Sequence, residues 1–295
     1  MNPGTDAPQL KYVCVGHQSQ DVHINAHGVR EPAEHGGASL FTALTTWLVT
    51  GEPVAVVSAT GTGALQEAAS NGLETYSNPK VPQTIFEDWR DGDTRRQRLI
   101  SRSPAIDASL EPLGKRGRNA TAVFACPLLD ELPLDCRSWF WSEFAALIPQ
   151  GWFRHIDADG NITLVPPDAS LITGPWDLVV LSHEEAAAIG DLSEWKKLAR
   201  VLAVTEGSRG ATIYSEGIEQ HVPAFLPPAV VDTTGAGDVW TAAFAIRFME
   251  TRNIAEAGRF ASAAGAICVS RRGLRGVPES RREIEQMLVT TRIQG

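Results

Sequence analysis

The stretch that decides the fold is Val231-Asp-Thr-Thr-Gly-Ala-Gly-Asp238, which runs directly into Val239-Trp-Thr-Ala-Ala-Phe-Ala-Ile-Arg247. Small residues give way abruptly to an apolar helical pattern, which predicts a helix over residues 235–250. The unpaired amides at its start would point at one spot, where the helix dipole is positive, and would suit a phosphoryl group in transfer. These amides belong to Gly235, Ala236 and Gly237. Asp238 beside them can take a proton from an attacking alcohol.

A simpler interpretation fits a lone Gly-Ala-Gly-Asp motif, because a glycine turn followed by an aspartate also caps ordinary helices. The segment here is longer, since it begins at Asp232 and ends in an alanine-rich helix, and this length favours the anion site. Two other phosphate-binding patterns are excluded. The chain has no G-x-x-x-x-G-K-[ST] loop, and Gly61-Thr-Gly63 lacks the third glycine of the dinucleotide fingerprint.

The composition is that of a globular protein of 295 residues, with 43% hydrophobic and 21% charged residues. The 26 basic residues against 35 acidic ones give a net charge of −9, which argues against general nucleic-acid binding and against an anionic membrane surface. No apolar run reaches the roughly 18 residues of a membrane-spanning helix, and the start lacks a signal-peptide pattern. The four cysteines form no CxxC pair, which suggests neither a zinc site nor a disulfide framework. Because Cys14, Cys126 and Cys268 sit in apolar runs, we expect them to be reduced core residues of a cytoplasmic protein.

Short apolar runs alternate with longer helical patterns along the chain. This alternation predicts a single α/β domain over residues 1–295, built on a mainly parallel sheet with helices on both faces. The predicted strands are residues 12–15, 54–58, 121–125, 178–181 and 201–205, with a hairpin over 211–214 and 219–222. Besides 235–250, the predicted helices are residues 37–50, 64–70, 139–148, 183–189, 254–270 and 280–289.

Two polar segments interrupt this rhythm, residues 20–35 and residues 74–104. The first holds a short alternating run, and the second is typical of short polar strands around an Asp91-Gly92 turn. Neither segment has enough apolar residues for a core of its own. We therefore expect both to be β insertions that pair beside the main sheet as a small lid.

The segment from Asp232 to Asp238 resembles the C-terminal signature of the ribokinase-like (PfkB-type) carbohydrate kinases. The resemblance implies the three-layer α/β fold of that family, with a mainly parallel central sheet and a small β lid. It also implies that Asp238 is the catalytic base and that the amides from Gly235 to Asp238 form an anion hole.

Further landmarks follow in the family's order over nearly the whole chain. Asp21 resembles the sugar-binding aspartate, and Gly36-Gly37 resembles the diglycine at the lid hinge, where substrate hydroxyls meet the backbone. Gln150-Gly-x-x-Arg154 resembles a segment near the substrate. Thr205-Glu-Gly207-Ser-Arg-Gly210 resembles the segment that faces the nucleotide phosphates. Each landmark alone is typical of an ordinary turn or helix start, so the argument depends on their joint order.

Two positions depart from the family pattern. Ser182-His-Glu-Glu185 stands where the family has Asn-x-x-Glu, the pair that organises water around magnesium. The Ser182 hydroxyl can still hold a metal-bound water, so this change weakens the case for magnesium without excluding it. Phe41 lies where many sugar kinases carry a sugar-contacting asparagine, so the pocket should be less polar on that wall. The form Gly-Gly-Ala-Ser-Leu-Phe41 resembles the inositol kinase branch.

The resemblance implies ATP-dependent phosphorylation of a hydroxyl on a small polyhydroxylated molecule. Mg²⁺ would be held through water near Glu185, and a monovalent cation such as K⁺ near Asp232 and Thr234. The expected partners are ATP and a sugar or polyol, with no nucleic acid and no membrane. The protein would be a monomer or a homodimer through the lid.

The acceptor stays open at this point. Asp21 can accept hydrogen bonds from two hydroxyls, and Phe41 offers an apolar wall to a ring face, which favours a neutral sugar or cyclic polyol, an inositol first. The run Arg95-Arg96-x-Arg98 would instead suit a phosphorylated or acidic sugar, and a nucleoside is another alternative. A hypothesis from a different class is that the protein binds a ligand without catalysis and is a non-catalytic relative of these kinases. The intact Asp238 argues against this hypothesis.

Overall fold

The computed structural model describes residues 10–25, 27–58, 73–76, 80–91, 94–110 and 113–290. Its centre is a nine-stranded sheet in the order β15-β14-β13-β12-β9-β8-β1-β4-β5. All neighbours from β5 to β13 pair in parallel, and β14 pairs antiparallel with both β13 and β15. The strands are β1 (Tyr12–Val15), β4 (Val54–Val57), β5 (Leu73–Tyr76), β8 (Ala122–Ala125), β9 (Phe144–Leu147), β12 (Trp176–Ser182), β13 (Ala199–Thr205), β14 (Ala211–Ser215) and β15 (Ile218–Val222).

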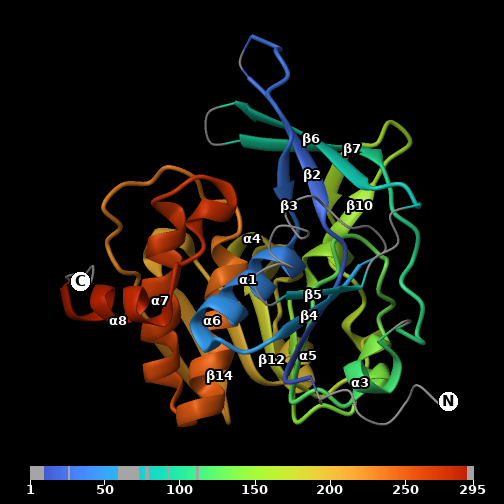
Figure 1. The fold of residues 1–295 in the computed structure, drawn as a ribbon. Helices are drawn as coiled ribbons and strands as arrows, with labels where there is room; N and C mark the ends of the chain where they lie inside the picture. Colours follow the sequence, from blue (N-terminus) through green and yellow to red (C-terminus); the bar gives the residue numbers. More distant parts are fainter. Residues whose placement is uncertain are drawn as a thin grey trace, which may run out of the picture.

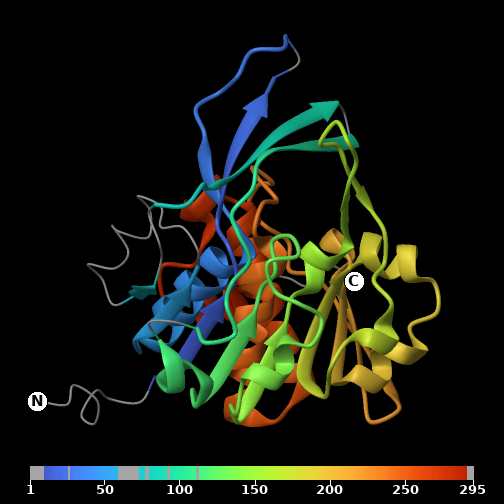
Figure 2. The ribbon, with the colours of Figure 1, turned by 90° about the vertical axis from the view of Figure 1, so that its right-hand side faces the viewer.

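Helices cover both faces of this sheet, as Figures 1 and 2 show. One face carries α1 (Ala38–Thr50), α6 (Ala236–Thr251), α7 (Ile254–Val269) and α8 (Arg281–Thr290). The other face carries α3 (Gly114–Arg118), α4 (His183–Ile189) and α5 (Ser193–Leu198). Short 3-10 turns complete the chain, namely η1 (Cys136–Trp139), η2 (Pro149–Phe153), η3 (Ala169–Leu171), η4 (Gly207–Arg209) and η5 (Gly273–Gly276). The predicted three-layer arrangement is therefore present.

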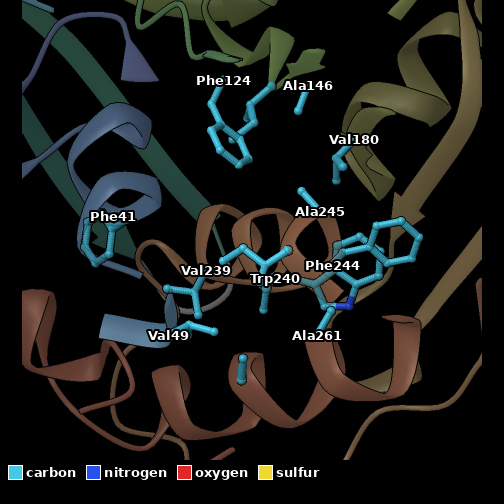
Figure 3. Close-up of a cluster of buried hydrophobic side chains, with 14 of the residues drawn as sticks. Phe41, Val49, Phe124, Ala146, Val180, Val239, Trp240, Phe244, Ala245 and Ala261 are labelled. Carbon is cyan, nitrogen blue, oxygen red and sulfur yellow. The ribbon is translucent and has the colours of Figure 1, made fainter. Parts of the chain in front are cut away.

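The alternation of side chains along each strand divides the core between the two faces. In β8, Phe124 packs against the α1, α6 and α7 side, while Val123 and Ala125 pack against the opposite side. Figure 3 shows the first of these clusters, where Phe41 of α1 and Val239 of α6 lie on the same side as Phe124. Helices α1 and α6 are thus held against each other by buried apolar contacts, which fixes the start of α6.

A separate four-stranded sheet, here called the small sheet, lies over one end of the main sheet (Figure 1). Its order is β3-β2-β6-β7, and β2 pairs in parallel with β6. The strands are β2 (Ser19–Ile24), β3 (Glu34–Gly36), β6 (Thr84–Asp91) and β7 (Thr94–Ser101). Phe86 attaches this sheet to Leu128 and Leu129 in a small buried cluster. Nearby, β10 (Arg154–Ile156) and β11 (Ile162–Leu164) form a two-stranded ribbon.

Two sequence predictions are wrong. Residues 139–148 were expected to be helical, but they contain the end of η1 and the strand β9. All four β9 side chains are buried, alternately on the two faces of the main sheet, and this period of two belongs to a strand. Residues 74–76 do not join the small sheet, because β5 pairs in parallel with β4 at the edge of the main sheet. The predicted helix over 64–70 lies outside the described residues.

The remaining helix and strand predictions hold to within a few residues, including α6, α7 and the β14–β15 hairpin. All four cysteines are free and buried. Within the described part of the chain, no helix is both long enough and apolar enough to span a bilayer.

Candidate active site

The turn before α6 is the centre of the site. Gly235 takes the left-handed conformation (φ 75°) that begins the helix, and a side chain at this position would overlap with the ring of Phe41. Phe41 is itself buried in α1. The aromatic ring therefore fixes the path of the glycine turn, which is a packing role that the sequence did not reveal.

The backbone amides of the turn were expected to form an anion hole. In the described part of the structure, the amides of Gly235, Gly237 and Asp238 donate to no acceptor. The Ala236 amide differs from this expectation, because it closes a turn with the Thr233 carbonyl at 3.3 Å. A side chain at Gly237 would meet nothing within 4 Å, so this residue borders open space. Unsatisfied amides at a helix start are suited to an anion.

Asp238 lies in the first turn of α6 and lines the same open space. Burial raises the pKa of its carboxyl to about 7. The positive charge of Arg154 lowers this pKa, and the negative charge of Glu185 raises it. A carboxyl with a pKa near neutrality can both accept and release a proton under physiological conditions, as a general base requires.

The open space is a cavity of about 550 Å³ between the small sheet and the carboxyl ends of the main strands. It brings together most of the residues that the sequence singled out. The lining residues that were predicted are Asp21, Gly37, Phe41, Gln150, Arg154, Ser182, Thr205, Thr234, Gly235, Ala236, Gly237 and Asp238. Those that the sequence analysis missed are Ser19, Ala38, Phe86, Gln97, Leu128, Glu184 and Thr233.

The small sheet contributes polar side chains to one wall of this cavity. Asp21 on β2 is only 8% exposed, and its carboxylate sits so close to Gly36 that a side chain there would clash with it. Gln97 on β7 lines the cavity as well. The arginine run behaves differently: Arg98 binds Glu87 at 2.7 Å, on the opposite face of the strand pair from Phe86. The Arg95 side chain lies outside the described part.

A second cavity of about 550 Å³ adjoins the first along the turn before α6. Thr205, Thr233, Ala236 and Gly237 line both cavities. The second one is mostly apolar and also contains the predicted Gly207 and Gly210. Its other walls come from Ser208, Ala224, Phe225, Leu226, Pro227, Val230, Trp240, Ser262, Gly265, Ala266 and Val269. The small residues of α7, spaced three or four apart, were the available signal for this hollow.

Ser182 and Glu185 form a capping box at the start of α4. The Glu185 amide donates to Ser182 Oγ (3.2 Å), and the Ser182 amide donates to Glu185 Oε2 (2.7 Å). Burial raises the pKa of Glu185. Its Oε1 accepts no hydrogen bond from the described residues, so one carboxylate oxygen remains for another ligand.

Asp232 organises the loop that leads into the glycine turn. Its Oδ1 accepts bonds from the amide and hydroxyl of Thr234 (3.0 and 2.8 Å), and its Oδ2 accepts one from the Gly273 amide (2.9 Å). Among the residues that the structure describes, no group of three or more His, Cys, Asp or Glu side chains could hold a metal ion. A cation here would thus have at most two such side chains as ligands and would also need water or backbone carbonyl groups.

Known proteins give independent comparisons. Residues 171–281 match the family described as pfkB family carbohydrate kinase. The chain is 37% identical to ribokinase from Bacillus subtilis over 109 residues, which are 36% of this chain and 37% of that protein. It is 28% identical to fructokinase-2 from Zea mays over 209 residues, 61% of each protein. The matches therefore span less than two thirds of the length of either relative.

Solved structures agree over nearly the whole chain. A pyrophosphate-dependent kinase in the ribokinase family, solved with a pyrophosphate analog and myo-inositol, has a TM-score of 0.76 and 22% identity, covering 93% of this chain and 99% of that one. Ribokinase from Arabidopsis thaliana, solved with ribose and ATP, has a TM-score of 0.69 and 18% identity over 96% and 99%. At these identities the likeness shows the fold. The resemblance drawn from the sequence is confirmed: the fold is ribokinase-like, and residues 171–281 match the pfkB family of carbohydrate kinases.

Proposed function

We propose that this protein is a kinase that transfers the terminal phosphoryl group of ATP to a hydroxyl of a small sugar or cyclic polyol. The observation that carries the proposal is the junction of two cavities at the turn before α6. At this junction Asp238, with a pKa of about 7, stands beside three amides that have no acceptor in the described structure. A proton acceptor and an anion site that lie together are what phosphoryl transfer to an alcohol requires.

The chemical step follows from this arrangement. The acceptor hydroxyl attacks the γ-phosphorus, its proton passes to Asp238, and the bond from the γ-phosphorus to the bridging oxygen breaks as ADP leaves. The amides of Gly235 and Gly237 would stabilise the charge on the phosphoryl oxygens. The products are a phosphorylated acceptor and ADP, and the proton on Asp238 returns to solvent.

The polar cavity would hold the acceptor. Asp21 would accept hydrogen bonds from two hydroxyls, while Gly36 and Gly37 allow close approach of the backbone. The small sheet would close over the acceptor as a lid and exclude water from the phosphoryl group. Phe41 and Phe86 would face the less polar side of a ring.

A neutral acceptor is favoured over an anionic one by the position of the arginine run. Arg98 is engaged by the buried Glu87, and neither Arg96 nor Arg98 lines the cavity. A neighbouring kinase of this fold was solved with myo-inositol, which makes an inositol the first acceptor to test.

The apolar cavity would hold the base of the nucleotide. A pyrophosphate donor would leave this cavity of about 550 Å³ without use, whereas an adenine ring would pack against Leu226 and the small residues of α7. Thr205 lines both cavities and Gly207 lines the apolar one, and both would contact the phosphates. The donor is therefore proposed to be ATP, although structural neighbours include pyrophosphate-dependent enzymes.

The residues present fit magnesium held through water. Mg²⁺ retains several waters in proteins, and Glu185 has one carboxylate oxygen with no hydrogen bond to the described residues. When bound, Mg²⁺ would neutralise charge on the ATP phosphates. The loop around Asp232 and Thr234 is the proposed position for a monovalent cation such as K⁺. The negative charge of the Asp232 carboxylate, which orders this loop through its bonds to Thr234 and Gly273, would favour a cation there.

The test is a panel of inositols, ribose, fructose, nucleosides, sugar phosphates and sugar acids, assayed with ATP and with pyrophosphate as donor. The proposal expects the highest kcat/KM for a neutral polyol or sugar with ATP. A winning sugar phosphate or sugar acid would overturn the neutral acceptor, and a preference for pyrophosphate would overturn the donor. No turnover with any pair, combined with tight binding of one panel member, would favour the non-catalytic relative.

A further inference from the structure

Arg154 is the strongest unexplained feature of the site. It begins β10 directly after η2 and lines the cavity together with Asp238. Of the described residues that line this cavity, Arg154 alone carries a positive charge. The resemblance to the kinase family placed Arg154 near the substrate. In the structure its side chain also contacts other residues of the protein.

Contacts with Leu128 and Phe86 hold the Arg154 side chain. Its Nη1 donates to the Leu128 carbonyl at 2.8 Å, in the loop after β8. Its guanidinium carbon lies 5.0 Å from the ring centroid of Phe86, on strand β6 of the small sheet. Such a cation–π contact is favourable and orients the planar group. Arg154 therefore joins the small sheet to the main body at the edge of the catalytic cavity.

The charged and titratable groups around Asp238 come from β2, β10, α4, α7 and the loop after β8. Glu185 at the start of α4 adds a negative charge, which raises the pKa of Asp238 further. The thiols of Cys126, after β8, and of Cys268, in α7, are held neutral because burial raises their pKa values. Arg154 is the group that lowers the pKa of Asp238. Asp21 and Glu184, also in the cavity, are acids and add no positive charge.

We propose that Arg154 is the positioning residue for the base: its guanidinium holds Asp238 in the ionised form, and Phe86 and the Leu128 carbonyl hold the guanidinium in place. The inference rests on the proposed function, because that function makes Asp238 the base that Arg154 assists. It gives Arg154 a role that exists before any acceptor is bound. It also couples the position of the small sheet to the ionised fraction of Asp238.

The sign of the effect is definite. Removal of the positive charge leaves burial and Glu185 unopposed, so the pKa of Asp238 rises above about 7. A nearby arginine typically lowers the pKa of an aspartate by about one to three units. Below the pKa of the base, each unit reduces the ionised fraction, and hence kcat/KM, about tenfold.

The experiment compares Arg154→Gln, Arg154→Lys and the wild-type enzyme by kcat/KM between pH 5 and pH 10. In the plot of kcat/KM against pH, the acid limb is the part where kcat/KM falls as the pH is lowered. For Arg154→Gln we expect this acid limb to move to higher pH by about one unit or more, with activity recovered at high pH. Arg154→Lys, which keeps the charge, should hold the limb within about half a unit. Arg200→Gln is the matched control, because Arg200 pairs with Asp177 at the opposite ends of the strands and is largely exposed.

An unchanged acid limb in Arg154→Gln, with only a higher KM for the acceptor, would overturn the proposal and leave Arg154 as an ordinary substrate contact. Phe86→Leu keeps the apolar cluster but removes the ring face. It should shift the limb in the same direction by a smaller amount, and the absence of any shift would refute the part assigned to Phe86.

A second readout does not depend on turnover. Titration of the Asp238 side-chain carboxyl by carbon-13 NMR, assigned by its loss in Asp238→Asn, gives its pKa in the ligand-free protein. Arg154→Gln should raise this value, and an unchanged value would refute the proposal. If the wild-type protein transfers no phosphoryl group at all, the proposed function fails while this titration still decides the role of Arg154.

Discussion

The two cavities that meet at the turn before α6 have similar volumes and opposite chemistry. The first is lined by acids, amides and hydroxyls, and it lies under the small sheet. The second is lined mostly by aliphatic, aromatic and glycine residues from the C-terminal third of the chain. One short turn thus separates a site built for hydrogen bonds from a site built for a flat apolar group. The specificities for the two proposed substrates should therefore be separable, whereas the chemistry at the turn between them is shared.

The largest expected effect comes from the shared element. Asp238→Asn should lower kcat by about 10²–10⁴, the usual range for a lost general base, while binding of both substrates is retained. The measurement is turnover at saturating substrates, with calorimetric binding of ATP as the control. Retention of more than half of the wild-type kcat would show that Asp238 is not the base.

The next effect should be confined to the polar cavity. Asp21→Asn keeps the shape of a side chain that is only 8% exposed but removes its charge. We expect kcat/KM for the acceptor to fall about 10²-fold, because hydroxyl donors lose their acceptor, with little change in the KM for ATP. Steady-state kinetics with each substrate varied in turn will test this. Equal losses for both substrates would contradict separable sites.

The reciprocal effect should be confined to the apolar cavity. Gly265 lies inside α7, and a methyl group there would make only ordinary contacts, 3.9 Å from Trp240 Cδ1 and 4.0 Å from the Ala236 carbonyl oxygen. Gly265→Leu should fill the cavity, favour the helix and raise the KM for ATP about tenfold. The acceptor KM is the internal control. If the KM for ATP stays at the wild-type value, the nucleotide base binds elsewhere.

The smallest effect concerns the link between the two sides. Arg272, in the loop after α7, binds Glu31 at 3.1 Å and Glu34 at 2.7 Å, and so ties the small sheet to the loop of Asp232. These side chains are between 30% and 57% exposed, so Arg272→Ala should cost less than about 1 kcal/mol in the free energy of unfolding. The loss should disappear at high salt, where such pairs are screened. Denaturant titrations at two salt concentrations, with Lys197→Ala as the surface control, measure it.

The glycine turn before α6 could be predicted from the sequence because the residues that define it are close together in the chain. Glycine spacing, the following apolar period and Asp238 all lie within a few residues of one another, and α6 begins at Ala236 as expected. The strand Phe144–Leu147 was predicted wrongly for the opposite reason. Its four apolar residues fit a helix or a buried strand equally well, and only the neighbours β8 and β12 decide between them.

Residues that act through distant contacts escaped the sequence analysis. Phe86 and Gln97 enter the cavity only because β6 and β7 pair and fold over the main sheet, and neither residue type marks a site by itself. The apolar cavity depends on the loop at Leu226 as well as on α7, and the small residues of α7 alone do not place that loop. Glu185 was predicted as a metal-water ligand, and the structure adds a capping bond to Ser182 that the S-x-x-E spacing already allowed.

The contact between Phe41 and Gly235 has a consequence for engineering. The ring of Phe41 occupies the space where a side chain at Gly235 would lie, and it also forms a wall of the polar cavity. A designer who replaces Phe41 with asparagine to admit a more polar substrate therefore also removes the support of the turn. A substitution of Phe41 made to change substrate selectivity is therefore expected to lower the rate as well. A useful redesign must include a second side chain that packs against the glycine turn in place of the ring.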